Sequence, residues 1–172
     1  MKRSIKLYNI IFPLWFLLFF PPIIFLTLIG NYIVDSLVIL ICFSVYKLVD
    51  SGFNLKTFYK KSILKIWGYG FLSDIIGAGI LFVLGLFGTR FGLPHELTSA
   101  ICYDPFSEPL AVIIILGSIA VSAIFIFLFN YKYSFRNLIE EKALRFKIAL
   151  TIAIVTAPWT FMLPTKWFIN GI

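Results

Sequence analysis

The chain has 172 residues, of which 60% are hydrophobic and 13% are charged, and its formal net charge is +7. Soluble domains are about half apolar and a quarter charged, so this composition excludes an ordinary water-soluble fold. The basic residues stand in short clusters between apolar stretches, which disfavours a nucleic-acid partner. We therefore predict an all-α, polytopic transmembrane helical bundle, with residues 1–172 forming a single integral membrane domain in contact with the lipid bilayer.

The apolar region from Leu7 to Tyr46 is long enough for two membrane crossings, because one crossing needs about 20 residues. Gly30 and Asn31 mark the predicted turn between the two crossings. Prolines interrupt the first crossing, and such a break frees backbone carbonyls that can line a cavity or coordinate an ion. The two expected spans cover residues 8–29 and 32–48, and the prolines are Pro13, Pro21 and Pro22.

Basic residues and apolar residues alternate at helical spacing after the second span. Residues 53–65 have the pattern of an amphipathic helix that lies in the membrane interface. A polar connection, residues 89–109, is the longest loop on the far side, and Pro158 interrupts the last span. The remaining expected spans cover residues 66–88, 110–130 and 148–165, which makes about five in total.

The distribution of Lys and Arg predicts the orientation, since short cytoplasmic loops carry the excess of both. In the five-span arrangement thirteen of the fifteen basic residues share the side of the N-terminus, and only Arg90 and Lys166 lie on the other side. We therefore expect a cytosolic N-terminus and a C-terminus outside. The expected location is the cell membrane, and more specifically the cytoplasmic membrane of a bacterium.

Asp35 and Asp74 are the carboxylates that fall inside predicted spans. They lie twelve residues from Lys47 and nine residues from Lys65, so at ~1.5 Å per residue both reach a similar depth near the middle of the bilayer. The interior of the spans offers no Lys, Arg or His, so the carboxylates need a proton, polar donors or a cation from water. The candidate proton or cation site comprises Asp35, Asp74, Asn31 and Ser73. The alternative is that Asp35 meets water at a helix end and Asp74 makes a structural interhelical contact.

Small residues in the third and fourth spans predict close helix packing, because a helix without large side chains lets a neighbour approach its backbone. The expected packing residues are Ser73, Gly77, Gly79, Ser118 and Ser122.

The far-side loop gathers polar residues that can bind metal or carry out nucleophilic chemistry. If Pro94 begins a short helix, His95 and Cys102 share one face of it. The spacing matches no recognised metal motif, so we expect neither a metal nor a cofactor. We also expect no disulfide, because Cys42 and Cys102 fall near opposite sides of the membrane. The candidate residues of this outer-loop site are His95, Glu96, Cys102, Asp104 and Glu108.

Three functional hypotheses remain open at the level of sequence. A transport or ion-pathway protein would use Asp35 and Asp74, and so few helices would then require a homo-oligomer or other membrane subunits. An accessory or assembly subunit, without catalytic activity, would dock to a larger complex through its glycine-rich helix. A membrane enzyme would use His95 and Cys102 in the outer loop.

Overall fold

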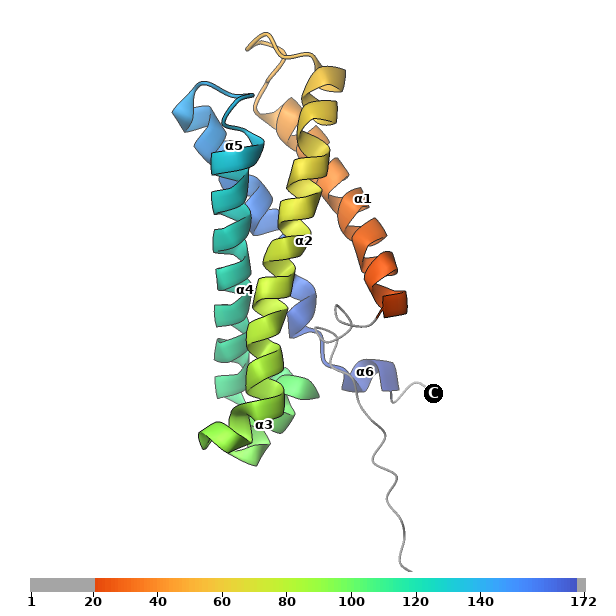
Figure 1. The fold of residues 1–172 in the computed structure, drawn as a ribbon, viewed down its shortest axis with the longest axis vertical. Helices are drawn as coiled ribbons and strands as arrows, with labels where there is room; N and C mark the ends of the chain where they lie inside the picture. Colours follow the sequence, from red (N-terminus) through yellow and green to blue (C-terminus); the bar gives the residue numbers. More distant parts are fainter. Residues whose placement is uncertain (1–20, 170–172) are drawn as a thin grey trace, which may run out of the picture.

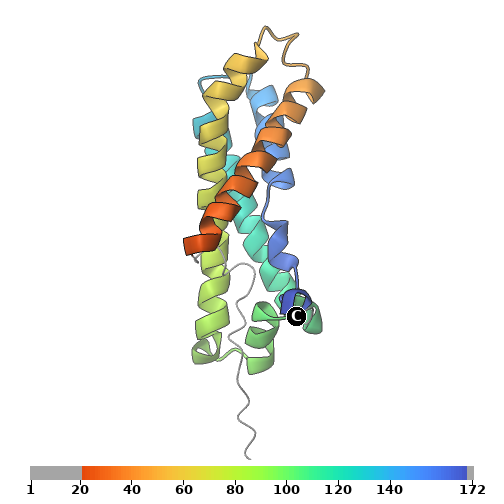
Figure 2. The same ribbon diagram turned by 90° about the vertical axis from the view of Figure 1, so that its right-hand side faces the viewer.

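The computed structural model describes residues 21–169, which form a bundle of helices without any strand in that range. Its α-helices are α1 (Pro21–Val45), α2 (Leu55–Phe87), α3 (His95–Cys102), α4 (Pro109–Phe129), α5 (Lys142–Val155) and α6 (Lys166–Ile169). Figure 1 shows that α2 and α4 run side by side along the molecule, whereas α3 lies at one end. Figure 2 shows α1 crossing the bundle obliquely. The predicted all-α class is therefore confirmed for the described residues.

Four helical stretches of the described part are long and apolar enough to cross a membrane. Even the shortest, Lys142–Met162, has 21 residues, close to the ~20 that one crossing needs. The prediction of a helical bundle with several membrane-capable helices is thus confirmed. The four stretches are Ile24–Val45, Leu55–Phe91, Pro109–Ser134 and Lys142–Met162.

The region of the first two predicted spans differs from the prediction. The expected turn at Gly30 and Asn31 is absent, because α1 continues through both residues from Pro21 to Val45. Pro21 and Pro22 are the first two described residues of α1. Residues 8–20 of the predicted first span, including Pro13, lie outside the described residues.

The predicted interfacial segment 53–65 and the predicted span 66–88 form one continuous helix, α2. The side chain of Asn54 accepts a hydrogen bond from the backbone N–H of Thr57 at 3.3 Å and caps the start of this helix. No proline or other strong helix breaker follows until Phe87, so the two predicted segments merge.

The last predicted span, 148–165, is interrupted in the structure. The helix α5 ends at Val155, and a 3₁₀ segment, η5 (Trp159–Met162), follows the break at Pro158. The fourth predicted span, 110–130, by contrast matches α4 within one residue at each end. Other short segments are the 3₁₀ segments η2 (Gly88–Phe91) and η3 (Pro105–Ser107) and the π-helical η4 (Asn130–Ser134).

Two apolar clusters fill the bundle, one toward each end. The first gathers residues such as Ile39, Phe58 and Ile148, and the second gathers residues such as Leu81 and Ile115. Between them lies a buried polar layer, because the buried residues of α2 between Ile66 in the first cluster and Ala78 in the second are all polar or small, namely Gly70, Ser73, Asp74 and Gly77. The buried polar residues of this layer are Asp35, Ser73, Asp74, Ser118 and Ser122.

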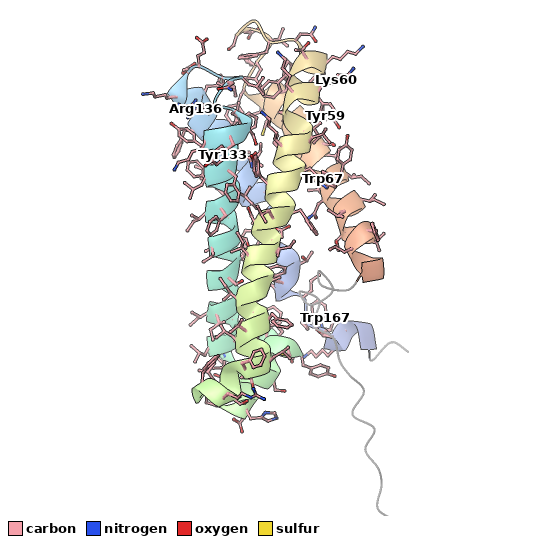
Figure 3. All side chains as sticks on the ribbon, in the orientation of Figure 1. Tyr59, Lys60, Trp67, Tyr133, Arg136 and Trp167 are labelled. Atoms are coloured by element: carbon pink, nitrogen blue, oxygen red, sulfur yellow. The ribbon has the colours of Figure 1, made fainter. Side chains whose placement is uncertain are left out.

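The two ends of the bundle differ in charge. The loops and helix ends that join α1 to α2 and α4 to α5 carry ten of the basic residues in the described part. Figure 3 shows Lys60 and Arg136 at this end, with Tyr59, Tyr133 and Trp67 near them, and Trp167 toward the opposite end. That opposite end carries Arg90 and Lys166 together with three acidic residues. We call the end with the ten basic residues the basic end. Its basic residues are Lys47, Lys56, Lys60, Lys61, Lys65, Lys132, Arg136, Lys142, Arg145 and Lys147.

Candidate functional site

Asp35 on α1 and Asp74 on α2 face each other across one small cavity in the polar layer. Both side chains are buried, since Asp35 is 4% exposed and Asp74 is 7% exposed. The cavity has a volume of about 20 Å³, roughly enough for one water molecule. The structure therefore brings together the two carboxylates that the sequence placed at one depth. The cavity is lined by Asn31, Val34, Asp35, Gly70, Asp74 and Thr156.

The hydrogen bonds of the two carboxylates are incomplete. The Asn31 side-chain amide donates to Oδ2 of Asp74 at 3.2 Å, whereas Oδ1 of Asp74 is buried without a hydrogen-bond partner in the described part of the chain. Asp35 packs against the backbone of Gly70, where an added Cβ would lie 3.5 Å from Oδ2 of the carboxylate. Neither carboxylate forms an ion pair with a described residue, because the one described salt bridge joins Lys166 to Asp104.

The broken end of α5 reaches the site, because Thr156 lines the small cavity. Pro158 has no N–H, so the carbonyl of Ile154 loses its usual helical donor, and the indole N–H of Trp159 donates to it instead at 2.9 Å. No described backbone hydrogen bond ends on the carbonyls of Val155 or Thr156. A helix C-terminus also carries partial negative charge, which favours a cation in front of it.

A second, larger cavity of about 440 Å³ lies against the same carboxylate. It shares Asn31, Val34, Asp74 and Thr156 with the small cavity and extends between α1 and the broken segment after α5. Neither cavity is lined by a described Lys, Arg or His. The other residues that line the larger cavity are Thr27, Gly30, Val155, Ala157, Pro158, Trp159, Thr160 and Phe161.

Ser73, the fourth residue of the candidate site, lines neither the small nor the larger cavity. Its hydroxyl donates to the carbonyl of Tyr69 at 2.7 Å, and its own carbonyl accepts from the Ser122 hydroxyl at 3.0 Å. Ser73 therefore belongs to the packing between α2 and α4. The structure thus groups Asn31, Asp35 and Asp74 with Thr156 around the small cavity and leaves Ser73 outside it.

The predicted packing residues meet where α2 contacts α4, with one exception. The Ser118 hydroxyl donates to the carbonyl of Gly77 at 2.7 Å, and a Cβ at Gly77 would lie only 2.1 Å from Oγ of Ser122. Gly79 differs, since nothing lies within 4 Å of its Cβ position. Gly79 therefore makes no close helix contact within the described residues.

The outer-loop residues do not form one site. His95 and Glu96 are exposed at the start of α3, while Asp104 pairs with Lys166 and Glu108 precedes α4. No group of three His, Cys, Asp or Glu residues that could hold a metal ion occurs among residues 21–169. The loop instead anchors the segment after η5, because the Thr165 hydroxyl donates to the carbonyl of Cys102 at 3.2 Å.

Cys102 has the properties of a structural thiol. Burial raises the pKa of the Cys102 thiol to about 11, so the reactive thiolate is scarce at neutral pH. No described hydrogen bond joins it to His95. It packs beside the apolar cluster at the far end, whereas Cys42 belongs to the cluster at the basic end. The two thiols are thus far apart along the bundle.

Thr156 and the carbonyls beside it are the part of the site that sequence analysis missed. The signal that was present is Pro158, which predicts a break in the helix but not which other helix faces the break. Comparisons with family models, with curated proteins and with solved structures gave no match for this chain.

Proposed function

We propose that this protein is a small membrane protein of the transport or ion-pathway class, which holds a proton or a small cation between Asp35 and Asp74. The observation that carries the proposal is the convergence of two buried carboxylates and the open C-terminal end of α5 on one small cavity. Every charge or partial charge of these groups is negative, and no basic side chain lines the cavity. Ionisable groups inside a membrane span are expensive, which makes such a pair a functional candidate.

The chemistry follows from charge balance. Two carboxylates in a poorly solvated cavity do not both stay ionised without a counter-charge, so they share a proton or enclose a cation. The cavity accommodates about one water-sized species, which suits a proton carried with water or a dehydrated alkali ion. The larger cavity beside Asp74 supplies a route by which water and ions exchange with the pair.

The proposed orientation places the basic end in the cytosol, because Lys and Arg concentrate in cytoplasmic loops. The aromatic residues Tyr59, Trp67 and Trp167 then fall toward the two membrane interfaces, where amphipathic rings are favoured. In this orientation α6 lies on the outside, as expected for the C-terminal end. A cytosolic N-terminus depends on residues 1–20, which lie outside the described residues.

A homo-oligomer is also part of the proposal, since four or five helices are few to enclose a continuous pathway. Partner subunits in the same membrane are the alternative. The accessory hypothesis depended on the small residues of α2 and α4. Gly77, Ser118 and Ser122 contact each other within one chain, whereas Gly79 has nothing within 4 Å of its Cβ position and leaves room for a partner helix. An accessory subunit is therefore the second candidate function.

The test is ion flux in proteoliposomes that contain the purified full-length chain. We expect proton or alkali-ion flux from the wild type, and loss of most of that flux in Asp35→Asn, Asp74→Asn and the double variant. Asp50→Asn is the matched control, because Asp50 is exposed in the loop after α1 and lies in neither cavity. Equal flux from the wild type and the double variant would contradict the proposal.

A further inference from the structure

We infer that the larger cavity beside Asp74 binds a hydrophobic organic ammonium ion. The inference extends the proposed function, since it names a substrate class for the same carboxylate. It concerns the 440 Å³ cavity between α1 and the segment from Val155 to Phe161, which we call the α1–η5 cavity.

The size and lining of the α1–η5 cavity fit a small organic molecule. Ligand sites commonly have volumes of about 300–1,000 Å³, with apolar walls and a few polar groups that fix the orientation of the ligand. The walls here are formed largely by apolar side chains such as Val34, Val155 and Phe161. A bare alkali ion has too few ligands in so wide a space and is better matched to the small cavity.

The charge of the cavity selects a cation. Asp74 is the one residue with a formal charge that lines it among the described residues, and its Oδ1 has no hydrogen-bond partner. Val155 and Thr156, whose carbonyls accept no described backbone hydrogen bond, also line the cavity. An anion would be repelled by Asp74, and a neutral ligand would leave the carboxylate without a counter-charge.

An aromatic ring completes the site. Trp159 lines the cavity and is 52% exposed, while its indole N–H is already bonded to the carbonyl of Ile154. The face of the ring therefore remains available to a quaternary or protonated amine, which indole binds through cation–π attraction. An ammonium ion with an apolar body satisfies the carboxylate, the ring and the apolar wall together.

The depth of the site distinguishes a free ammonium ion from a lipid headgroup. Asp74 lies nine residues after Lys65, the last lysine of the basic end on α2, which is about 14 Å along the helix at ~1.5 Å per residue. That distance places the carboxylate well inside the bundle, away from the headgroups at the basic end. The site is therefore open to a soluble or membrane-dissolved amine, and the experiment uses a bilayer that contains no ammonium lipid.

The test measures binding of benzyltrimethylammonium to the full-length chain in nanodiscs of phosphatidylglycerol, by equilibrium dialysis and by quenching of tryptophan fluorescence. Neopentylbenzene, in which carbon replaces the charged nitrogen, is the neutral analogue. We expect saturable binding of the cation, competition by other quaternary amines, and at least about tenfold weaker competition by neopentylbenzene. Equal competition by the neutral analogue would overturn the inference.

Gly30 and Gly79 provide a matched pair of variants that leaves the carboxylates unchanged. Both have nothing within 4 Å of the Cβ position, but only Gly30 lines the α1–η5 cavity. We expect Gly30→Leu to weaken benzyltrimethylammonium binding at least about tenfold, because its side chain fills the cavity, and Gly79→Leu to bind as the wild type does. Equal binding by both leucine variants would overturn the inference.

The same preparations separate the two proposals. The ammonium site is refuted if the wild type binds no benzyltrimethylammonium. If the wild type still shows ion flux that the double Asp-to-Asn variant loses, the proposed function stays intact. The ammonium site is supported if Asp74→Asn weakens the binding of benzyltrimethylammonium about tenfold and Gly30→Leu weakens it as well. The comparison of the charged and neutral probes on the wild type decides the question even if a variant fails to fold.

Discussion

Gly77 packs tightly against Ser118 and Ser122 of α4, so Gly77→Ala is a sharp test of the packing that positions the carboxylates. A Cβ at this position would lie 2.1 Å from Oγ of Ser122, 3.2 Å from the backbone oxygen of Ser118 and 3.3 Å from the ring of Phe161. Rotating the Ser122 hydroxyl away breaks its bond to the carbonyl of Ser73, and the Ser118 backbone cannot rotate away. The two helices must therefore separate slightly.

The expected loss of stability follows from three contributions. Overpacking of a filled interior costs about 1–3 kcal/mol. A lost interhelical hydrogen bond in a membrane protein costs about 0.6 kcal/mol. The higher helix propensity of Ala returns up to about 1 kcal/mol. Gly77→Ala should therefore lower the free energy of unfolding by about 1–3 kcal/mol.

The assay is unfolding of the purified chain in mixed micelles with increasing sodium dodecyl sulfate, followed by circular dichroism. Gly79→Ala is the control, since nothing lies within 4 Å of that Cβ position, and we expect it to unfold as the wild type does or slightly later. Adding Ser122→Ala to Gly77→Ala should recover part of the loss, because the contact at 2.1 Å disappears. The reasoning is refuted if Gly77→Ala leaves the transition unchanged or if Gly79→Ala destabilises the chain equally.

Two further predictions concern residues beside the site and at the far end. In a Cys42→Ala background at pH 8.5, Cys102 should react with iodoacetamide roughly a hundredfold more slowly than a free cysteine does. The reason is that burial raises the pKa of the Cys102 thiol to about 11, which leaves little thiolate at this pH. Its alkylation rate should rise with pH up to about 11, and a plateau near pH 9 would refute the assignment. In the same unfolding assay, Trp159→Phe should lower the free energy of unfolding by about 1 kcal/mol, since the carbonyl of Ile154 loses its hydrogen-bond donor. Trp167→Phe is the control and should have little effect, because the indole N–H of Trp167 makes no described hydrogen bond.

The helical bundle was predictable because lipid leaves the backbone few alternatives. Every backbone polar group inside a bilayer needs an internal partner, so long apolar stretches form helices. The same rule explains the failed turn at Gly30 and Asn31, since a helix that continues keeps the backbone hydrogen bonds that a turn would break. Turn propensity measured against water therefore misled the prediction for α1.

The candidate site was predictable in depth but not in its partners. Counting residues from the lysines placed Asp35 and Asp74 at one level, and the structure brings them to one cavity. Rotation of each helix about its axis decides which residues face the cavity, and the apolar pattern of these spans does not encode it. Ser73 therefore faces α4 although it precedes Asp74 directly, and Thr156 joins the site although nothing in its own sequence context indicates a ligand.

The protonation state of Asp35 and Asp74 tests the central claim most directly. Infrared spectroscopy of the chain with carbon-13-labelled aspartate separates a protonated carboxyl from a carboxylate, and Asp35→Asn/Asp74→Asn identifies the bands of this pair. In buffer without alkali ions at neutral pH, we predict the band of a protonated carboxyl, and this band should be absent from the double variant. If an alkali ion binds between the two aspartates, adding that ion should replace the band by that of a carboxylate. Two carboxylates ionised at neutral pH, with spectra that no cation changes, would contradict the account.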